Sequence, residues 1–216
     1  LIHEQNAVAG FTNRCLAHVA RRVLTAFPGS FRPRVGAEVV GNPVRREIVE
    51  LPPPAQRFSL HNDAIRVLVL GGSQGAARLN AIVPFALAHA APLKFDVRHQ
   101  AGERWLHTVQ QNYAQAGVSA RLHAFIDEMA EAYGWADLVI CRAGALTVSE
   151  LAAAGVGAVL VPFPAATDDH QTRNAGALVD AGAAVVIPER QLSAEQLAGV
   201  LTVLCGSREQ LLSMTE

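Results

Sequence analysis

The fold of this chain is decided by the stretch Arg66-Val67-Leu68-Val69-Leu70-Gly71-Gly72-Ser73-Gln74-Gly75-Ala76. Its apolar run is typical of a buried strand, and the glycines that follow remove Cβ atoms where the backbone has to come close to a neighbour. A helix that starts directly after the turn points its free N–H groups and the positive end of its dipole back into it. This arrangement favours a bound anion, most often a phosphate or diphosphate, over a plain strand-to-helix turn.

A second unit of the same kind is Asp137-Leu138-Val139-Ile140-Cys141-Arg142-Ala143-Gly144-Ala145-Leu146-Thr147-Val148-Ser149-Glu150. Two such units in one sheet predict a nucleotide-type ligand at the carboxyl ends of parallel strands. Thr147 and Glu150 also have the spacing of a capping box, in which Thr147 caps the helix and Glu150 reaches back. Glu150 could instead accept hydrogen bonds from a ribose diol, because a carboxylate has four lone-pair sites. The spacing alone favours the cap.

Strands and helices alternate from Ile65 to the end of the chain. We predict strands at 65–70, 93–98, 120–124, 137–141, 157–162 and 184–187. The helices between them are predicted near 76–90, 103–116, 129–133, 147–154 and 169–181, with a last one from Ser193. This alternation predicts an α/β fold with a parallel, doubly wound sheet.

The residues before Ile65 have a different pattern. They predict a helix over 7–25, with short strands at 25–27 and 38–40. The proline run Leu51-Pro52-Pro53-Pro54 and the polar residues after it are typical of a linker. We therefore expect one domain over 1–44, a linker over 45–64 and a second domain over 65–216.

Composition places the chain among globular proteins. Of its 216 residues, 50% are hydrophobic and 17% are charged, and no apolar run reaches the roughly 18 residues that span a bilayer. No secretory signal is visible. The three cysteines are far apart and form no CxxC pair, which favours free thiols in a reducing cytoplasm.

Charge is unevenly spread along the chain. Residues 1–46 hold seven arginines against two glutamates, a net charge of +5, whereas the rest of the chain carries −6. The basic segment could face phosphates or an anionic membrane surface, or it could be a solvated helix face. Nucleic acid is disfavoured as a partner, because neither a basic stripe with interleaved aromatics nor a zinc-finger or helix-turn-helix spacing is present.

Three further polar stretches are candidate sites. Asp168-Asp169-His170-Gln171 has adjacent carboxylates without a D-x-D spacing, which favours a helix start over a metal site. Gln171 and Asn174 share a helix face and could bind sugar hydroxyls. His3-Glu4-Gln5-Asn6 precedes a helix and, taken alone, could be only its start.

Together, these stretches resemble one family. The MurG family of bacterial N-acetylglucosaminyltransferases is similar in five segments, which occur here in order as His3-Glu4-Gln5-Asn6-Ala7-Val8-Ala9-Gly10, Val40-Gly41-Asn42-Pro43-Val44-Arg45, Gly71-Gly72-Ser73-Gln74-Gly75-Ala76, Gly144-Ala145-Leu146-Thr147-Val148-Ser149-Glu150 and Asp169-His170-Gln171-x-x-Asn174-Ala175. The match runs from residue 2 to the end. Five linked motifs make this resemblance much more specific than any one of them.

The resemblance implies a GT-B fold, in which two Rossmann-like domains face each other across the active site. This chain would then hold the C-terminal domain and a remnant of the N-terminal one. It also implies a hexosyltransferase of peptidoglycan synthesis, with roles in cell wall biogenesis, cell shape and cell division. The enzyme would transfer GlcNAc with inversion from UDP-GlcNAc to undecaprenyl-pyrophosphoryl-MurNAc-pentapeptide (lipid I) and form lipid II. No metal or other cofactor is expected, and the location implied is the cytoplasmic side of the inner membrane, as a peripheral protein.

The resemblance also implies a UDP-GlcNAc site. Its residues would be Asn6, Arg45, Ser73, Ile126, Ala145, Leu146, Thr147, Val148, Ser149, Glu150 and Gln171. In this interpretation Ser73 and nearby N–H groups bind the diphosphate, the Ile126 backbone meets uracil, Glu150 binds ribose and Gln171 binds the sugar. This raises Glu150 as a ligand above the capping interpretation.

The family's N-terminal glycine-rich turn, with the histidine proposed as general base, would lie before Leu1. We therefore expect a fragment that lacks its N-terminal part, binds the donor and is inactive alone, with its catalytic residue unknown. Two alternatives stay open. One is another UDP-sugar enzyme of the same fold, such as a UDP-GlcNAc 2-epimerase, and the other is a non-catalytic nucleotide-sugar-binding module.

Overall fold

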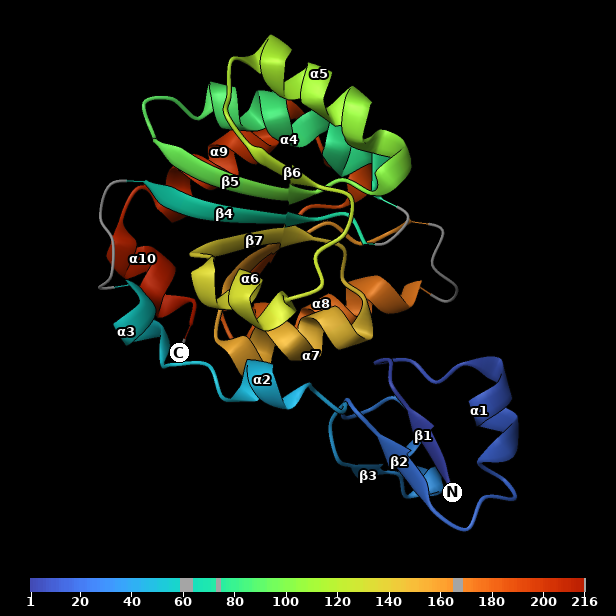
Figure 1. The fold of residues 1–216 in the computed structure, drawn as a ribbon. Helices are drawn as coiled ribbons and strands as arrows, with labels where there is room; N and C mark the ends of the chain where they lie inside the picture. The colour runs from blue at the N-terminus through green and yellow to red at the C-terminus, as the bar shows by residue number, and fades with distance from the viewer. Residues whose placement is uncertain (59–63, 73–74, 165–168, 216) are drawn as a thin grey trace.

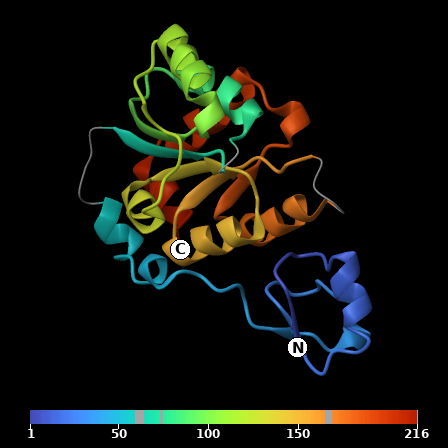
Figure 2. The same ribbon diagram turned by 45° about the vertical axis from the view of Figure 1, so that its right-hand side comes forward.

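The computed structural model describes residues 1–58, 64–72, 75–164 and 169–215, which form a small and a large lobe (Figure 1). The small lobe has a parallel sheet in the order β1-β2-β3. Its elements are β1 (Ile2–Glu4), α1 (Phe11–Leu16), β2 (Val23–Thr25), the 3-10 helix η1 (Pro33–Val35) and β3 (Glu38–Val39). Figure 2 shows the same two lobes from a second direction, with the small lobe beside one end of the large one.

The large lobe is built on a six-stranded parallel sheet in the order β6-β5-β4-β7-β8-β9. Its strands are β4 (Ile65–Leu70), β5 (Phe95–Gln100), β6 (Arg121–His123), β7 (Leu138–Cys141), β8 (Gly157–Leu160) and β9 (Ala184–Val186). The chain starts at β4 in the middle, winds outward to β6, crosses to β7 and winds outward in the other direction. This is the doubly wound order of a Rossmann-like fold, so the fold prediction is confirmed.

Helices cover both faces of this sheet (Figure 1). One apolar core lies between the sheet and α4 (Ala77–His89), α5 (Leu106–Ala116), α9 (Ala194–Cys205) and α10 (Arg208–Ser213). The other lies between the sheet and α2 (Arg46–Val49), α6 (Met129–Trp135), α7 (Ala145–Ala154) and α8 (His170–Asp180). Within β4, Val67 and Val69 enter the first core and Leu68 and Leu70 the second. A strand that is buried on both faces reads as a continuous apolar run, which explains the sequence signal.

The helix predicted over 7–25 is wrong. Only α1 is helical there, and Val23–Thr25 instead forms β2, which pairs with β1 and β3. The short strand expected at 25–27 therefore lies two residues earlier. Val19, which lies within the predicted helix, is 81% exposed. Pairing of β-branched residues with two neighbouring strands outweighs a helical periodicity that has no core to cover.

The segment interpreted as a linker contains two short helices, α2 and α3 (Pro54–Phe58). Ile48 of α2 is fully buried in the second core. Arg57 of α3 is also buried, and its guanidinium donates to the backbone oxygens of Tyr133, Ala154 and Gly155. This segment therefore packs on the large lobe, and the domain boundaries within it stay a prediction.

Membrane spans, metal sites and cysteine chemistry bear on the possible function of the described residues. None of their helices is both long and apolar enough to cross a membrane. They contain no group of three or more His, Cys, Asp or Glu side chains placed to share a metal ion. The three cysteines are free thiols, with Cys15 exposed and Cys141 and Cys205 buried.

A buried polar network links β5 to α4 and α5. The His99 side chain is fully buried, with Nε2 lying 3.0 Å from Asn80 Oδ1 and Nδ1 lying 3.0 Å from the Tyr113 hydroxyl. Asn80 Nδ2 donates to the Ala101 carbonyl, which orients the amide and makes Oδ1 the acceptor. His99 is therefore the neutral Nε2–H tautomer, and Tyr113 donates to Nδ1. Burial lowers the pKa of His99 to about 3.

This network predicts a pH dependence of stability. The unfolded chain takes up a proton on His99 below its ordinary pKa of 6.5, whereas the folded chain does so only near 3, so stability falls as the pH falls through that window. Between pH 7 and pH 5, the free energy of unfolding should drop by about 2 kcal/mol because of this residue. Urea denaturation should show this drop for the parent chain. His99→Gln should be less stable than the parent at pH 7, but its free energy of unfolding should not show the drop that His99 causes. The exposed His107 gives the control, since His107→Gln should lose as much stability between pH 7 and pH 5 as the parent does. The same loss of stability in His99→Gln as in the parent would contradict the burial of a neutral His99.

Candidate functional site

The glycine-rich turn after β4 needs glycine for steric reasons. A Cβ on Gly71 would lie 2.9 Å from both Ala76 N and the Gln100 carbonyl oxygen. Gly75 has φ +73°, and a Cβ there would collide with the Ala101 carbonyl oxygen and the Trp105 ring. The turn is therefore pressed against the end of β5. Ser73, predicted to bind a diphosphate, and Gln74 lie outside the described residues.

Helix α4 starts at Ala77, directly after this turn. Its N-cap residue, Ala76, provides no side-chain cap, and the first turn holds no acidic residue. The first N–H groups of a helix have no intrahelical acceptor, so they and the helix dipole favour an anion here. The start of α4 therefore leaves its first N–H groups without a side-chain cap, and they can donate to an anion.

Helix α7 starts at the neighbouring strand end and is also uncapped by a side chain. Its N-cap residue is Gly144, which makes Thr147 the third residue of the helix rather than its cap. The capping box favoured by spacing is therefore wrong, and Glu150 does not reach back to a cap. The reason is that the helix begins two residues earlier than the predicted 147, at Ala145, so the box is out of register.

A cavity of about 770 Å³ lies at the carboxyl ends of β4 and β7. We call it the main cavity, and six of the predicted site residues line it: Arg45, Ile126, Leu146, Thr147, Glu150 and Gln171. A side cavity of about 670 Å³ adjoins it and shares Gly71, Arg142 and Gln171 with it. The start of α4 lines this side cavity. Arg45, which directly precedes α2, thus meets residues that lie at or just after the ends of β4, β5, β6 and β7.

Glu150 is held by two side chains in the wall of the main cavity. Its Oε1 accepts from Arg45 Nη2 at 2.9 Å, and its Oε2 accepts from the Tyr133 hydroxyl at 3.1 Å. The carboxylate side chain is 17% exposed and that of Arg45 is 50% exposed. Burial, with the nearby Cys141 and Glu150, raises the pKa of Tyr133 well above its ordinary value, so the hydroxyl stays a donor at neutral pH.

Gln171 and Arg142 lie where the two cavities meet. Gln171 Oε1 accepts from the Phe163 backbone N–H at 2.8 Å, so the amide NH₂ is the donor that this side chain has for a ligand. Arg142 pairs with Glu189, and its guanidinium lies over the Phe163 ring at 5.4 Å. Arg142 Nη1 also donates to the Val161 carbonyl.

Four predicted site residues do not line the main cavity. Ala145 and Val148 are buried in the second core. Ser149 accepts a hydrogen bond from Asn42 Nδ2 at 3.0 Å, and its own hydroxyl donates to the Ala145 carbonyl. Asn6 contacts Glu4 and Asn174 instead of the cavity. The assignment of these four residues to the UDP-GlcNAc site stays a prediction.

The small lobe contacts α7 through Asn42 and α8 through Ala7. The Ala7 N–H donates to Asn174 Oδ1 at 2.7 Å, and Asn174 is fully buried. Burial alone would raise the pKa of Glu4, but hydrogen bonds from Asn6, Asn13 and Gly10 outweigh it and lower that pKa. The ionised Glu4 thereby shapes the loop that meets α8.

Tyr133, Phe125 and Met129 also line the main cavity, and sequence reasoning missed all three as site residues. Tyr133 was only placed on a helix near 129–133. Its role depends on a contact between α6 and α7, and no spacing in the sequence reports that contact.

Comparisons with known proteins agree with this geometry. Residues 66–216 match the model of the glycosyltransferase family 28 C-terminal domain. The chain is 53% identical over 217 residues to a Marinobacter nauticus protein named UDP-N-acetylglucosamine--N-acetylmuramyl-(pentapeptide) pyrophosphoryl-undecaprenol N-acetylglucosamine transferase, a match that covers 100% of this chain and 60% of the relative. The crystal structure of Acinetobacter baumannii MurG is similar with a TM-score of 0.87 and 40% identity, over 99% of this chain and 61% of that one. The chain thus spans about three fifths of the length of both.

A more distant likeness concerns the fold alone. A Listeria monocytogenes crystal structure described as a UDP-N-acetylglucosamine 2-epimerase has a TM-score of 0.63 at 12% identity, over 94% of this chain and 56% of that one. At this identity, only the arrangement of strands and helices is shared.

The close approach of Gly75 to the end of β5 predicts that Gly75→Ala destabilises the chain. We expect a loss of about 1–3 kcal/mol in the free energy of unfolding, because the new Cβ meets backbone that cannot move without shifting the end of β5. Gly176→Ala is the matched control, since nothing lies within 4 Å of a Cβ there and alanine is the better helix former in α8. Chemical denaturation compares the two, and equal stability of both variants would contradict the close approach at Gly75.

Proposed function

This chain belongs to glycosyltransferase family 28, and on that premise we propose that its main cavity binds UDP-GlcNAc as sugar donor. We propose further that the whole protein transfers GlcNAc to undecaprenyl-pyrophosphoryl-MurNAc-pentapeptide (lipid I), with lipid II as product. The observation that carries the proposal is the position of Glu150. Glu150 lines the main cavity, which also contacts the uncapped start of α7. The side cavity next to it contacts the uncapped start of α4.

The proposed binding mode assigns one part of the donor to each wall. The diphosphate lies against the N–H groups of the glycine-rich turn and of the two helix starts, with Ser73 as a further donor. Uracil meets the Ile126 backbone, the ribose hydroxyls donate to Glu150, and the GlcNAc hydroxyls meet Gln171. Arg45 lies on the Glu150 side of the cavity, where its charge also favours the diphosphate.

The chemistry that these groups support is the departure of UDP. As the bond to the anomeric carbon breaks, negative charge grows on the diphosphate and the sugar becomes oxocarbenium-like. Fixed N–H donors and two helix dipoles stabilise that charge without reorganising during the reaction. Deprotonation of the acceptor hydroxyl requires a general base, which we do not assign to a residue of this chain.

Two alternatives make different predictions for the same ligand. A UDP-GlcNAc 2-epimerase would interconvert the donor without any acceptor, and a binding module would hold it unchanged. UDP-GlcNAc is therefore titrated into the chain by calorimetry, and the full-length protein is then offered radiolabelled UDP-GlcNAc with lipid I. Label in lipid II supports the transferase, label in an epimer formed without acceptor supports the epimerase, and binding without turnover leaves the module.

We predict that Glu150→Ala lowers the affinity for UDP about tenfold or more, since hydrogen bonds to a charged group are lost. The variant should also be less stable, because the buried Tyr133 hydroxyl loses its acceptor. Glu131→Ala is the control, as this exposed carboxylate of α6 pairs with Arg98 on the surface. Calorimetry measures both affinities, and intact UDP affinity in Glu150→Ala would sink the proposed binding mode.

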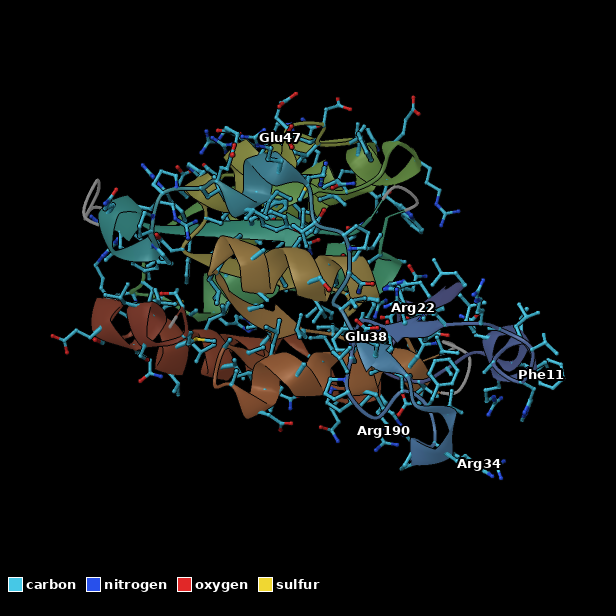
Figure 3. All side chains as sticks on the ribbon, turned by 90° about the horizontal axis from the view of Figure 1, so that it is seen from below. Phe11, Arg22, Arg34, Glu38, Glu47 and Arg190 are labelled. Atoms are coloured by element: carbon cyan, nitrogen blue, oxygen red, sulfur yellow. The ribbon has the colours of Figure 1, made fainter. Side chains whose placement is uncertain are left out.

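We also propose that the small lobe faces an anionic membrane surface, as a peripheral protein on the cytoplasmic side of the inner membrane. Arg14, His18, Arg32 and Arg34 line a depression of about 470 Å³ in this lobe. Phe11 is 74% exposed nearby on α1, and Figure 3 shows Phe11 and Arg34 projecting outward from the lobe. Basic groups beside an exposed apolar side chain fit a surface of anionic lipid.

Arg34→Ser should therefore weaken binding to vesicles that contain anionic lipid about fivefold, the effect of about 1 kcal/mol per basic residue near such a surface. Lys94→Ser removes an exposed charge just before β5, at the sheet end opposite the main cavity, and should have no effect. Co-sedimentation with vesicles measures the binding of both variants. Binding that does not change with the anionic lipid content would contradict the proposal that the small lobe faces an anionic membrane surface.

A further inference from the structure

The hydroxyl of Tyr133 is a buried donor in the wall of the main cavity. The residue is 1% exposed, and its hydroxyl donates to Glu150 Oε2 at 3.1 Å, which joins α6 to α7. The other carboxylate oxygen, Oε1, accepts from Arg45 at 2.9 Å. Among the residues that the structure describes, each oxygen of Glu150 therefore has one hydrogen-bond partner.

The Glu150 carboxylate has more acceptor sites than Tyr133 and Arg45 use. A carboxylate has about four lone-pair sites, so two remain after Tyr133 and Arg45, one on each oxygen. A ribose presents two neighbouring hydroxyls, O2′ and O3′, which need one acceptor each. We propose that Tyr133 is a positioning residue that fixes the Glu150 carboxylate to accept both hydroxyls, and so makes the cavity selective for ribonucleotides over deoxyribonucleotides. This inference rests on the proposed function, because it assumes a uridine nucleotide in the main cavity.

Tyr133 is itself held in place from the backbone side. Arg57 Nη1 donates to the Tyr133 carbonyl at 3.1 Å, and Nη2 of the same guanidinium donates to the Ala154 and Gly155 carbonyls. One buried side chain thus ties α6 to the end of α7, the helix that carries Glu150. This tie restrains the two helices that carry the tyrosine hydroxyl and the carboxylate.

The two partners of Glu150 contribute differently. The Arg45 side chain is half exposed, so water screens its interaction and its geometry is loosely held. Tyr133 is buried, and its proton stays in place at neutral pH because burial raises its pKa. The rigid part of the orientation therefore comes from the tyrosine.

The test is a pair of affinities, for UDP and for 2′-deoxy-UDP, measured by calorimetry. The parent chain should prefer UDP about tenfold, the effect of one hydrogen bond to a carboxylate. In Tyr133→Phe, which keeps the ring and loses only the hydroxyl, that preference should shrink to about twofold or threefold. Tyr113→Phe is the matched control, since it removes an equally buried hydroxyl that bonds to His99 instead. This control should keep the parent's preference.

The outcomes separate the inference from its premise. If the parent chain does not bind UDP, the proposed function fails. If the parent binds UDP and Tyr133→Phe keeps the parent's preference, only the positioning role is overturned. A double-mutant cycle gives a second readout, because Tyr133→Phe should have no further effect on UDP affinity in a Glu150→Gln background. Full additivity of the two substitutions would also overturn the inference.

Discussion

The whole site depends on the pairing of β4 with β7 at the point where the winding of the sheet reverses. Leu70 pairs with Cys141 in a parallel register, so the two strands end side by side and at the same level. The turns that follow leave toward opposite faces of the sheet, one into α4 and the other into α7. The gap between them is therefore a consequence of topology, and it is flanked by two helix starts whose dipoles point the same way.

Two arginines that line the cavities are paired with glutamates. Arg45 pairs with Glu150, and Arg142 pairs with Glu189. A guanidinium has five N–H donors, so each arginine can meet an anion and keep its glutamate. The Arg142–Glu189 pair, whose two side chains are mostly shielded from solvent, holds its guanidinium in place, and a ligand that meets this arginine then loses less ordering entropy on binding.

Much of this could be predicted from the sequence, and the failures have physical causes. In the large lobe, strands such as Ile65–Leu70 are buried on both faces and their local signals agree with the global fold. In the small lobe, β2 exists because β1 and β3 lie on either side of it, and nothing within residues 7–25 reports that pairing. In the site, motif spacing found Glu150 but misjudged it as a cap, because the start of α7 was placed two residues late. Tyr133 could not be found, since its contact with Glu150 arises only when α6 packs against α7.

The motif around His3 to Asn6 has a role that differs from the one its polar residues suggest. Glu4 uses both carboxylate oxygens within its own loop, on Asn6, Gly10 and Asn13. That loop presents the Ala7 N–H to the buried Asn174, which in turn donates to Asn6 Oδ1 and to the Ala143 carbonyl just before α7. The motif therefore connects the small lobe to the segment between β7 and α7, one wall of the main cavity. The buried Asn174 amide thus ties the small lobe to that wall, because losing its partners would cost about 1–3 kcal/mol.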